Sequence, residues 1–342
     1  MIANSTRSAE ADLDPQEGSR PFPAQPRSTP MESKQFTHFE DYAAAVIHAD
    51  LQLKIPRLVQ SQWELQAMSL GQISLQLGRE GSGSIAEGSV QQSGYTLFVP
   101  LAGLQYANGQ TLEEQRVLVM TSGGELTIAS KVPHDWCSIV LPFEVLGHAP
   151  QGPHDFPYPP GTSLVVDVEV RTMRRLRQVL FDIDHAIKSD PTLQFVPAAK
   201  QSLQCELLAA CKPVVAAKNQ STPTMGRPTL SRRDIIQRIT AIIENSPSES
   251  LSIDLLVNEA EVSVRTLRNI FLEYYGLSPH RFLVIHRLHQ ARKALRLEST
   301  ESAKVTTIAA EHGFWHFGRF AHEYRQLFGE SPSQTLSRPA NY

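Results

Sequence analysis

Cysteine is scarce in this chain, which has only three among its 342 residues. Cys137, Cys205 and Cys211 form no Cys-x-x-Cys pair, so the sequence predicts neither a disulfide framework nor a zinc cluster. Cys205 and Cys211 lie in an apolar stretch of helical pattern, where buried free thiols are expected. This sparse usage is typical of a reduced, cytoplasmic protein.

Long apolar runs are missing too. No stretch approaches the roughly 18 apolar residues that a bilayer-spanning helix needs. The N-terminus also lacks the basic start and apolar stretch of a secretory signal. We therefore expect no membrane partner.

The motifs of common catalytic centres are absent as well. No Gly-rich stretch ends in Lys-Ser/Thr as a phosphate loop does, and no serine nucleophile elbow occurs. His134, His148 and His154 stand apart, whereas a metal-binding β-barrel needs a close cluster. His312 and His316 have i, i+4 spacing but lack a zincin pattern. We expect no catalytic residues, no metal and no cofactor, and the protein is not predicted to be an enzyme.

Charge is divided unevenly along the chain, whose formal net charge is −3. Ser231–Tyr342 contains 14 Lys and Arg against 12 Asp and Glu, and the remainder contains 18 against 23. An acidic front and a mildly basic back suggest two functions in one chain. The basic excess is too small to identify a nucleic-acid-binding domain by itself.

Composition and periodicity divide the chain into four parts. Residues 1–35 are polar and Pro-rich and are expected to form a disordered tail, unless translation starts at Met31. Residues 36–212 are predicted to be a β-rich sensor or dimerisation domain. Residues 213–231 are rich in Pro, Thr and Ser and are the expected linker. Residues 232–342 have a helical pattern throughout.

The front domain is predicted to be a small β-barrel-like unit followed by two helices. Ile73, Leu75 and Leu77 alternate with polar residues, which is the period of a half-buried strand. Short apolar runs separated by turn-forming residues predict further strands at Tyr95–Leu101, Arg116–Met120, Glu125–Ser130, Trp136–Leu141 and Ser163–Val170. Helical periodicity then follows in two stretches, around Met173–Ile183 and Leu203–Cys211. These helices either cap the sheet or form a dimer interface.

The segment 252–275 has the pattern of a helix-turn-helix unit. A short apolar helix is followed by a tight connection and then by Ser263, a suitable N-cap for a second helix. The face of that helix predicted to be buried contains Val264, Leu267, Phe271 and Tyr274. The other face is left with Arg265, Thr266, Arg268 and Asn269. Arg and Asn can make bidentate contacts to guanine and adenine, and Thr can bond a base edge or a phosphate.

A similar pattern recurs near the C-terminus. A short helix from Val305 stops at Gly313, which suits a left-handed C-cap, and Phe314 is expected to pack in the turn. The following helix is predicted to bury Phe317, Phe320, Tyr324, Leu327 and Phe328. Trp315, His316 and Arg319 are left as candidate DNA contacts of this second unit.

One continuous helix is predicted between the two units, over residues 278–298. Its length of roughly 30 Å compares with the ~34 Å between successive major-groove faces of B-DNA, so it could place two reading helices in adjacent turns. Its basic residues are expected either to meet phosphates or to pair with local acids. They are Arg281, Arg287, Arg292, Lys293 and Arg296.

Residues 233–336 resemble the DNA-binding domain of AraC-type (AraC/XylS) transcription regulators. The matching residues are Ser263, Leu267, Phe271, Gly276, Ser278–Pro279, Arg287–Arg292, Ile308–Ala309, Gly313–Phe314, Phe320 and Phe328–Ser333. The resemblance implies a sequence-specific regulator of double-stranded DNA, commonly an activator that meets RNA polymerase. It also implies a front barrel that binds a small-molecule effector or forms a homodimer. The fold class is therefore α+β multidomain, with an all-α C-terminal domain of two helix-turn-helix units.

The chain departs from the family pattern at Asn269, Gly318, His322 and Tyr324, which puts the DNA contacts of the second unit in doubt. Three other interpretations stay open at this point. The first is a metal-dependent β-barrel enzyme fused to a DNA-binding domain. The second is a DNA-repair fusion, although the cysteine spacing it needs is missing. The third is a regulator whose front domain only dimerises or meets a protein.

Overall fold

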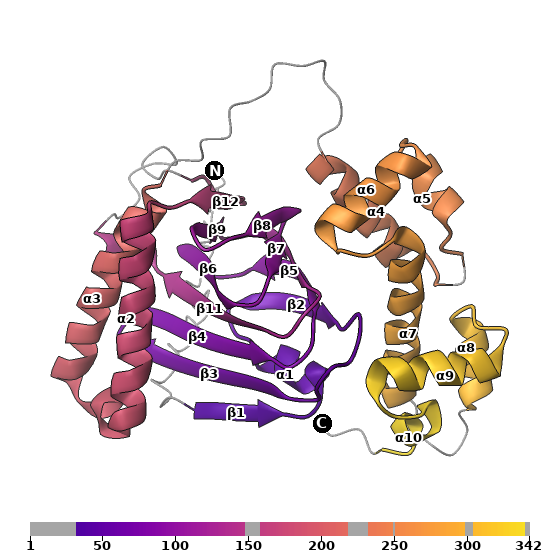
Figure 1. The fold of residues 1–342 in the computed structure, drawn as a ribbon, viewed down its shortest axis with the longest axis horizontal. Coiled ribbons are helices and arrows are strands. Elements are labelled where there is room, and N and C mark those ends of the chain that lie inside the picture. The colour runs from indigo at the N-terminus through magenta and orange to yellow at the C-terminus, as the bar shows by residue number, and fades with distance from the viewer. Residues whose placement is uncertain (1–31, 148–157, 218–231, 249, 298–303, 339–342) are drawn as a thin grey trace, which may run out of the picture.

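The computed structural model describes residues 32–147, 158–217, 232–248, 250–297 and 304–338. These residues form a sheet-rich front domain and a helical C-terminal domain (Figure 1). The strands are β1 (Glu32–Phe36), β2 (Ala49–Lys54), β3 (Trp63–Leu70), β4 (Ile73–Glu80), β5 (Ile85–Val90), β6 (Tyr95–Ala102), β7 (Gln105–Ala107), β8 (Gln110–Leu112), β9 (Arg116–Thr121), β10 (Glu125–Ser130), β11 (His134–Leu141) and β12 (Ser163–Asp167). The predicted tail, 1–35, lies outside the described residues except for its last four, which belong to β1.

The strands form two sheets. One has seven strands in the order β1-β3-β4-β11-β6-β9-β12, and the other has five in the order β2-β5-β10-β7-β8. The pairings are antiparallel. The sheet-rich domain and its predicted strands are confirmed, except that the last strand ends at Asp167 and Val170 begins the following helix. The sheets are nevertheless open, with distinct edge strands, and do not close into a barrel.

The seven-stranded sheet is buried on both faces. Along β6, Leu97 and Val99 belong to the core shared with the following helices, while Phe98 belongs to the core shared with the other sheet. This two-sided burial explains why β6 is apolar almost throughout, since each face of a strand takes alternate residues.

Helices α2 (Val170–Ser189) and α3 (Pro197–Val215) cover one face of the seven-stranded sheet (Figure 1). Met173, Leu176 and Ile183 of α2 are buried against it, so the interpretation of these helices as a cap on the sheet is confirmed. Cys211 is buried as expected. Cys205 is exposed, so that prediction was wrong: its side chain lies on the outer face of α3.

The C-terminal domain contains seven described helices. They are α4 (Arg232–Asn245), α5 (Ile253–Glu259), α6 (Val264–Tyr274), α7 (Pro279–Leu297), α8 (Val305–Glu311), α9 (Phe317–Phe328) and α10 (Pro332–Leu336). The continuous helix predicted between the units is α7, which runs from the α4–α6 unit to the α8–α10 unit (Figure 1). No helix in the described ranges is both long and apolar enough to cross a membrane.

Apolar contacts join the two domains. Phe39, from the short helix α1 (Phe39–Ala45) of the front domain, stacks on Phe328 of α9 with ring centroids 6.1 Å apart. Ile85 and Ala129 of the five-stranded sheet belong to the core of the first helical unit. The five-stranded sheet and α1 therefore form the front domain's side of an interdomain interface.

Candidate nucleic-acid interface

The first helix-turn-helix unit consists of α5 and α6. Ser252 and Ser263 cap the two helices by accepting hydrogen bonds from the amides of Leu255 and Thr266, each at 3.1 Å. Capping of this kind satisfies an otherwise unpaired amide of the first turn. The N-cap role predicted for Ser263 is confirmed.

The buried face of α6 differs from the prediction at one position. Leu267, Phe271 and Tyr274 are buried, but the side chain of Val264 is 58% exposed, so its predicted burial was wrong. Val264 is the first residue of α6 and lies beyond the end of the core. Ile270 is the further buried residue of this helix.

The four predicted contact residues of α6 all face solvent. They are Arg265, Thr266, Arg268 and Asn269. The Thr266 hydroxyl lies 2.9 Å from the capping hydroxyl of Ser263, which holds it at the start of the helix. Arg265 and Arg268 form no ion pair with the described residues, so their guanidinium groups are available to a ligand.

The second unit consists of α8 and α9. Gly313 takes φ +78° in the turn, in the left-handed region that favours glycine. Phe314 packs on Phe320 with ring centroids 4.9 Å apart, so the predicted turn packing is confirmed. Phe317 is 43% exposed at the first position of α9, so its predicted burial was wrong for the same reason as that of Val264.

The predicted contact residues of the second unit are exposed as well. Trp315 is 72% exposed, the largest exposed fraction among the exposed apolar side chains of the described chain. His316 and Arg319 are also exposed, at the start of α9. Arg319 forms an ion pair with Glu323 one turn along the helix at 2.9 Å, so it is partly neutralised before any ligand arrives.

Helix α7 sets the spacing of the two units. Its 19 residues correspond to about 28 Å of helix axis. Arg287 ties α7 to the first unit by donating to the carbonyl oxygens of Ser248, at 2.9 Å, and Leu251. The role in phosphate binding considered for Arg287 is therefore replaced by a structural one.

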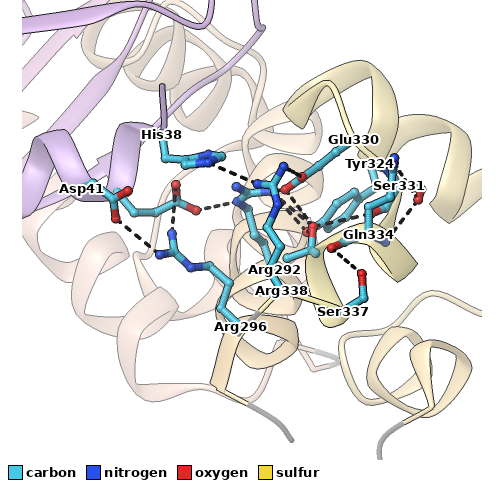
Figure 2. A network of polar contacts seen from close by, with 12 residues as sticks. His38, Asp41, Arg292, Arg296, Tyr324, Glu330, Ser331, Gln334, Ser337 and Arg338 are labelled. Carbon is cyan, nitrogen blue, oxygen red and sulfur yellow. Dashed lines mark hydrogen bonds and ion pairs between the residues drawn. The ribbon is translucent and has the colours of Figure 1, made fainter. Parts of the chain in front are cut away.

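Two further basic residues of α7 pair with acids rather than facing outward. Arg292 is 4% exposed and binds Glu40 of α1 at 2.5 Å and Glu330 at 2.6 Å (Figure 2). Arg296 pairs with Glu40 at 3.2 Å and with Asp41 at 3.4 Å. Of the two roles considered for these arginines, pairing with acids is the one observed.

A second candidate site is a cavity of about 60 Å³ in the front domain. It lies between the two sheets, beside α1 and the segment that joins α1 to β2. Its lining includes Tyr42, Glu80, His134 and Trp136. Of these residues only His134 was considered from the sequence, as a histidine too isolated to bind a metal.

A hydrogen-bond cluster fills the polar side of this cavity. The Trp136 indole donates to the Tyr42 hydroxyl at 3.0 Å and to Glu80 Oε1 at 3.1 Å, and the Tyr42 hydroxyl donates to the same Oε1 at 3.3 Å. Burial raises the pKa of Tyr42, and the nearby Glu80 carboxylate adds to this. The hydroxyl therefore stays protonated and remains a donor.

Comparison with known proteins agrees with the helix-turn-helix geometry. Residues 256–338 match a family described as helix-turn-helix domain. The chain is 36% identical over 100 residues to the XylDLEGF operon transcriptional activator of Pseudomonas putida. The aligned residues make up 29% of this chain and 31% of that protein. It is 30% identical over 171 residues to a probable thc operon regulatory protein of Rhodococcus erythropolis. The aligned residues make up 50% of this chain and 51% of that protein.

Among solved structures, the chain is similar to the AraC-like transcriptional activator CuxR. That likeness has a TM-score of 0.41 and 13% identity, and it covers 76% of this chain and 94% of the other. The chain thus spans about a third of the first curated relative and about half of the second.

Proposed function

Because the C-terminal domain of this chain belongs to the AraC-type helix-turn-helix family, we propose that the protein is a transcription regulator that reads two adjacent major-groove segments of double-stranded DNA. One observation carries the proposal. The seven candidate contact residues are exposed and lie in the first half of α6 and around the N-terminal end of α9. Helix N-termini that present Arg, Asn and Thr are typical of helices that read base edges.

The spacing of the two helices supports binding along one face of DNA. The ~28 Å of α7 is close to the ~34 Å that separates successive major-groove faces. Contacts to phosphates would add a salt-dependent, sequence-independent contribution to affinity. Arg281 and Lys293 support this part because both are exposed on α7 and form no ion pair with the described residues.

The remaining parts of the proposal concern partners and setting. We place the regulator in the cytoplasm, as a non-enzymatic activator that meets RNA polymerase. The front domain would bind a small-molecule effector or form a homodimer. The buried polar cavity supports the effector role, since small-molecule sites combine an apolar lining with a few placed polar groups.

Selection of duplexes from a random pool by the full chain, followed by sequencing, tests the DNA-reading function. Two enriched sequence blocks about one helical turn apart are expected. A variant with Arg265→Ala and Arg268→Ala should lose the block read by α6. The matched control replaces Arg171 and Arg174, which are exposed on α2, and should recover both blocks. No enrichment over the starting pool would overturn the proposal.

A further inference from the structure

Helix α1 has two opposite faces, and each contacts a different functional part of the molecule. Residues two apart on a helix point about 200° apart, since each residue turns the helix by about 100°. Glu40 points toward the C-terminal domain, where it binds Arg292 and Arg296. Tyr42 points the other way, into the cavity between the sheets. A helix of seven residues thus lies directly between the cavity and the DNA-binding domain.

The face toward the C-terminal domain makes a dense set of contacts. Figure 2 shows Arg296 of α7 reaching Asp41 of α1, while Arg338 lies beside His38. Arg292 of α7 pairs with Glu40 of α1. The Arg292 guanidinium also lies 5.6 Å from the ring centroid of Phe39 and 4.7 Å from that of Phe328. These contacts involve both α7 and α9, so a movement of α1 would be felt by the second helix-turn-helix unit.

The cavity face of α1 meets a carboxylate whose hydrogen bonding is incomplete. Glu80 is 4% exposed, and its Oε1 accepts from Tyr42 and Trp136. Its Oε2 is buried and accepts no hydrogen bond from the described residues. The His134 Nε2 atom lies 3.7 Å from it, beyond hydrogen-bonding distance. An unsatisfied buried carboxylate oxygen is costly, so Oε2 offers a strong acceptor to any donor that enters the cavity.

The rest of the lining defines the class of ligand. Leu51, Phe98, Met120 and Ile128 supply apolar contacts in the same cavity. A ligand that fits must therefore carry a hydrogen-bond donor at one end and a short apolar body at the other. A primary ammonium group is the best match, because it supplies donors together with a charge that compensates the carboxylate.

We propose that the cavity binds a small primary amine against Glu80, and that α1 transmits its binding to the DNA-binding domain through the ion pairs of Glu40 and Asp41. The coupling half of this inference rests on the proposed DNA-reading function, whereas the binding half does not. A volume of about 60 Å³ accommodates a few water molecules or a ligand of a few heavy atoms. A ligand bound to Glu80 Oε2 lies beside the Tyr42 hydroxyl, which donates to the other oxygen of the same carboxylate, and Tyr42 belongs to α1.

Binding is tested on the full chain with n-butylamine and butyrate, which have similar alkyl chains and differ in the polar group. The amine should raise Tm by a few degrees at saturation and quench tryptophan fluorescence through Trp136, while butyrate should do neither. Glu80→Gln should abolish the effect of the amine, and Glu113→Gln, at a carboxylate exposed outside the cavity, should retain it. Equal responses to amine and butyrate, or none to the amine, would overturn the site without relying on any variant.

Coupling is tested by measuring the Kd for the selected duplex with and without saturating n-butylamine. The ratio should differ from one by about fivefold or more, and by linkage bound DNA should change the Kd of the amine by the same factor. Glu40→Gln with Asp41→Asn should bring both ratios close to one. Asp50→Asn, at an exposed carboxylate of β2 that pairs with no described residue, should leave them unchanged.

The outcomes separate the two proposals. If the amine binds and the DNA affinity does not change, or if the Glu40 and Asp41 variant keeps the wild-type ratio, transmission through α1 is overturned while DNA reading stands. If the full chain selects no DNA sequence, the proposed function fails, and the Tm and fluorescence responses still decide whether the amine site exists.

Discussion

Arg268 and Arg319 differ in what they would have to give up in order to contact DNA. Arg268 is exposed and forms no ion pair with the described residues, whereas Arg319 is paired with Glu323 at 2.9 Å. A bidentate contact to guanine is worth about 1–3 kcal/mol of discrimination. We therefore expect Arg268→Ala to weaken binding to the selected duplex by about 1–3 kcal/mol and to relax the preference at one position. Fluorescence anisotropy with the selected and a scrambled duplex measures both effects.

The control for Arg268→Ala is Arg174→Ala, which removes an equally exposed arginine from α2. It should leave both affinities unchanged. Equal losses on the selected and the scrambled duplex for Arg268→Ala would instead assign Arg268 to a phosphate, since phosphate contacts carry no sequence information.

Arg292 contacts both domains at the interface. Its guanidinium is buried between the carboxylates of Glu40 and Glu330, and the rings of Phe39 and Phe328 lie beside it. Arg292→Met retains much of the side-chain volume but leaves buried carboxylates without their partner. We expect a loss of about 3–5 kcal/mol in the free energy of unfolding, measured by urea denaturation. Lys293→Met, at the exposed neighbouring position, should change it by no more than about 0.5 kcal/mol.

At the scale of one helix, α9 offers a direct test of how glycine is used. A Cβ added at Gly318 would meet no atom within 4 Å, and Gly318 does not adopt a left-handed φ. Gly318→Ala should therefore stabilise the domain by about 0.5–1 kcal/mol, because glycine costs more conformational entropy in a helix. Gly329 is the contrasting case, with φ +74° and a Cβ position 2.9 Å from Leu58. Gly329→Ala should lower Tm while Gly318→Ala raises it, and a fall in Tm for both would contradict this account.

The elements themselves could largely be predicted from the sequence, because their signals are local. Capping serine, helical period and turn glycine identify α6, α7 and α9 within a few residues. The exposure of Val264 and Phe317 could not be predicted, since periodicity assigns a face to a residue but does not say where the core ends. The open sheets escaped prediction because strand order depends on pairing between distant segments, which alternation does not encode.

The cavity was missed for a related reason. In β4, Leu75 and Leu77 contact the core under the helices, and alternation alone predicts that the positions between them face solvent. Those positions face the second sheet instead, so Gln76 and Glu80 are buried. A strand with two buried faces can place a carboxylate in a cavity, and only the presence of a second layer reveals it.

At the scale of the whole molecule, the interface joins residues that no sequence window connects. Glu40 and Arg292 are 252 positions apart. The basic residues of α7 had two open roles, phosphate binding or pairing with acids, and the choice depended on where the front domain lies. The contact residues of α6 and α9 are exposed although α1 of the front domain pairs with α7. Contact between the domains and access to DNA are therefore compatible in this arrangement.

Two histidines of α7, the buried His286 and the partly buried His289, make this arrangement sensitive to acid. Burial lowers the pKa of His289 to about 3 and that of His286 to about 4, from an unfolded value near 6.5. His289 Nε2 lies 3.1 Å from the Ile55 amide nitrogen and 3.2 Å from the Ile55 carbonyl oxygen across the interface. A neutral ring can accept from the amide, and a protonated ring cannot. Because both folded-state pKa values are depressed, the contribution of the two neutral histidines to the free energy of unfolding is complete above about pH 6.5. It is lost as the pH falls toward 4, by about 1.4 kcal/mol per pH unit for each histidine.

Urea denaturation of the full chain between pH 5 and 8 measures this dependence, in a range where most carboxylates remain ionised. His289→Gln cannot be protonated, so its stability should fall more slowly below pH 6.5, by the equivalent of one proton. His185→Gln, at an exposed position of α2 away from the interface, should retain the wild-type slope. If His289→Gln and the wild type lost stability in parallel, the ring would have to be solvated or protonated in the folded protein. The front domain would then not cover α7 at Ile55, and the domains would not be held together at this point.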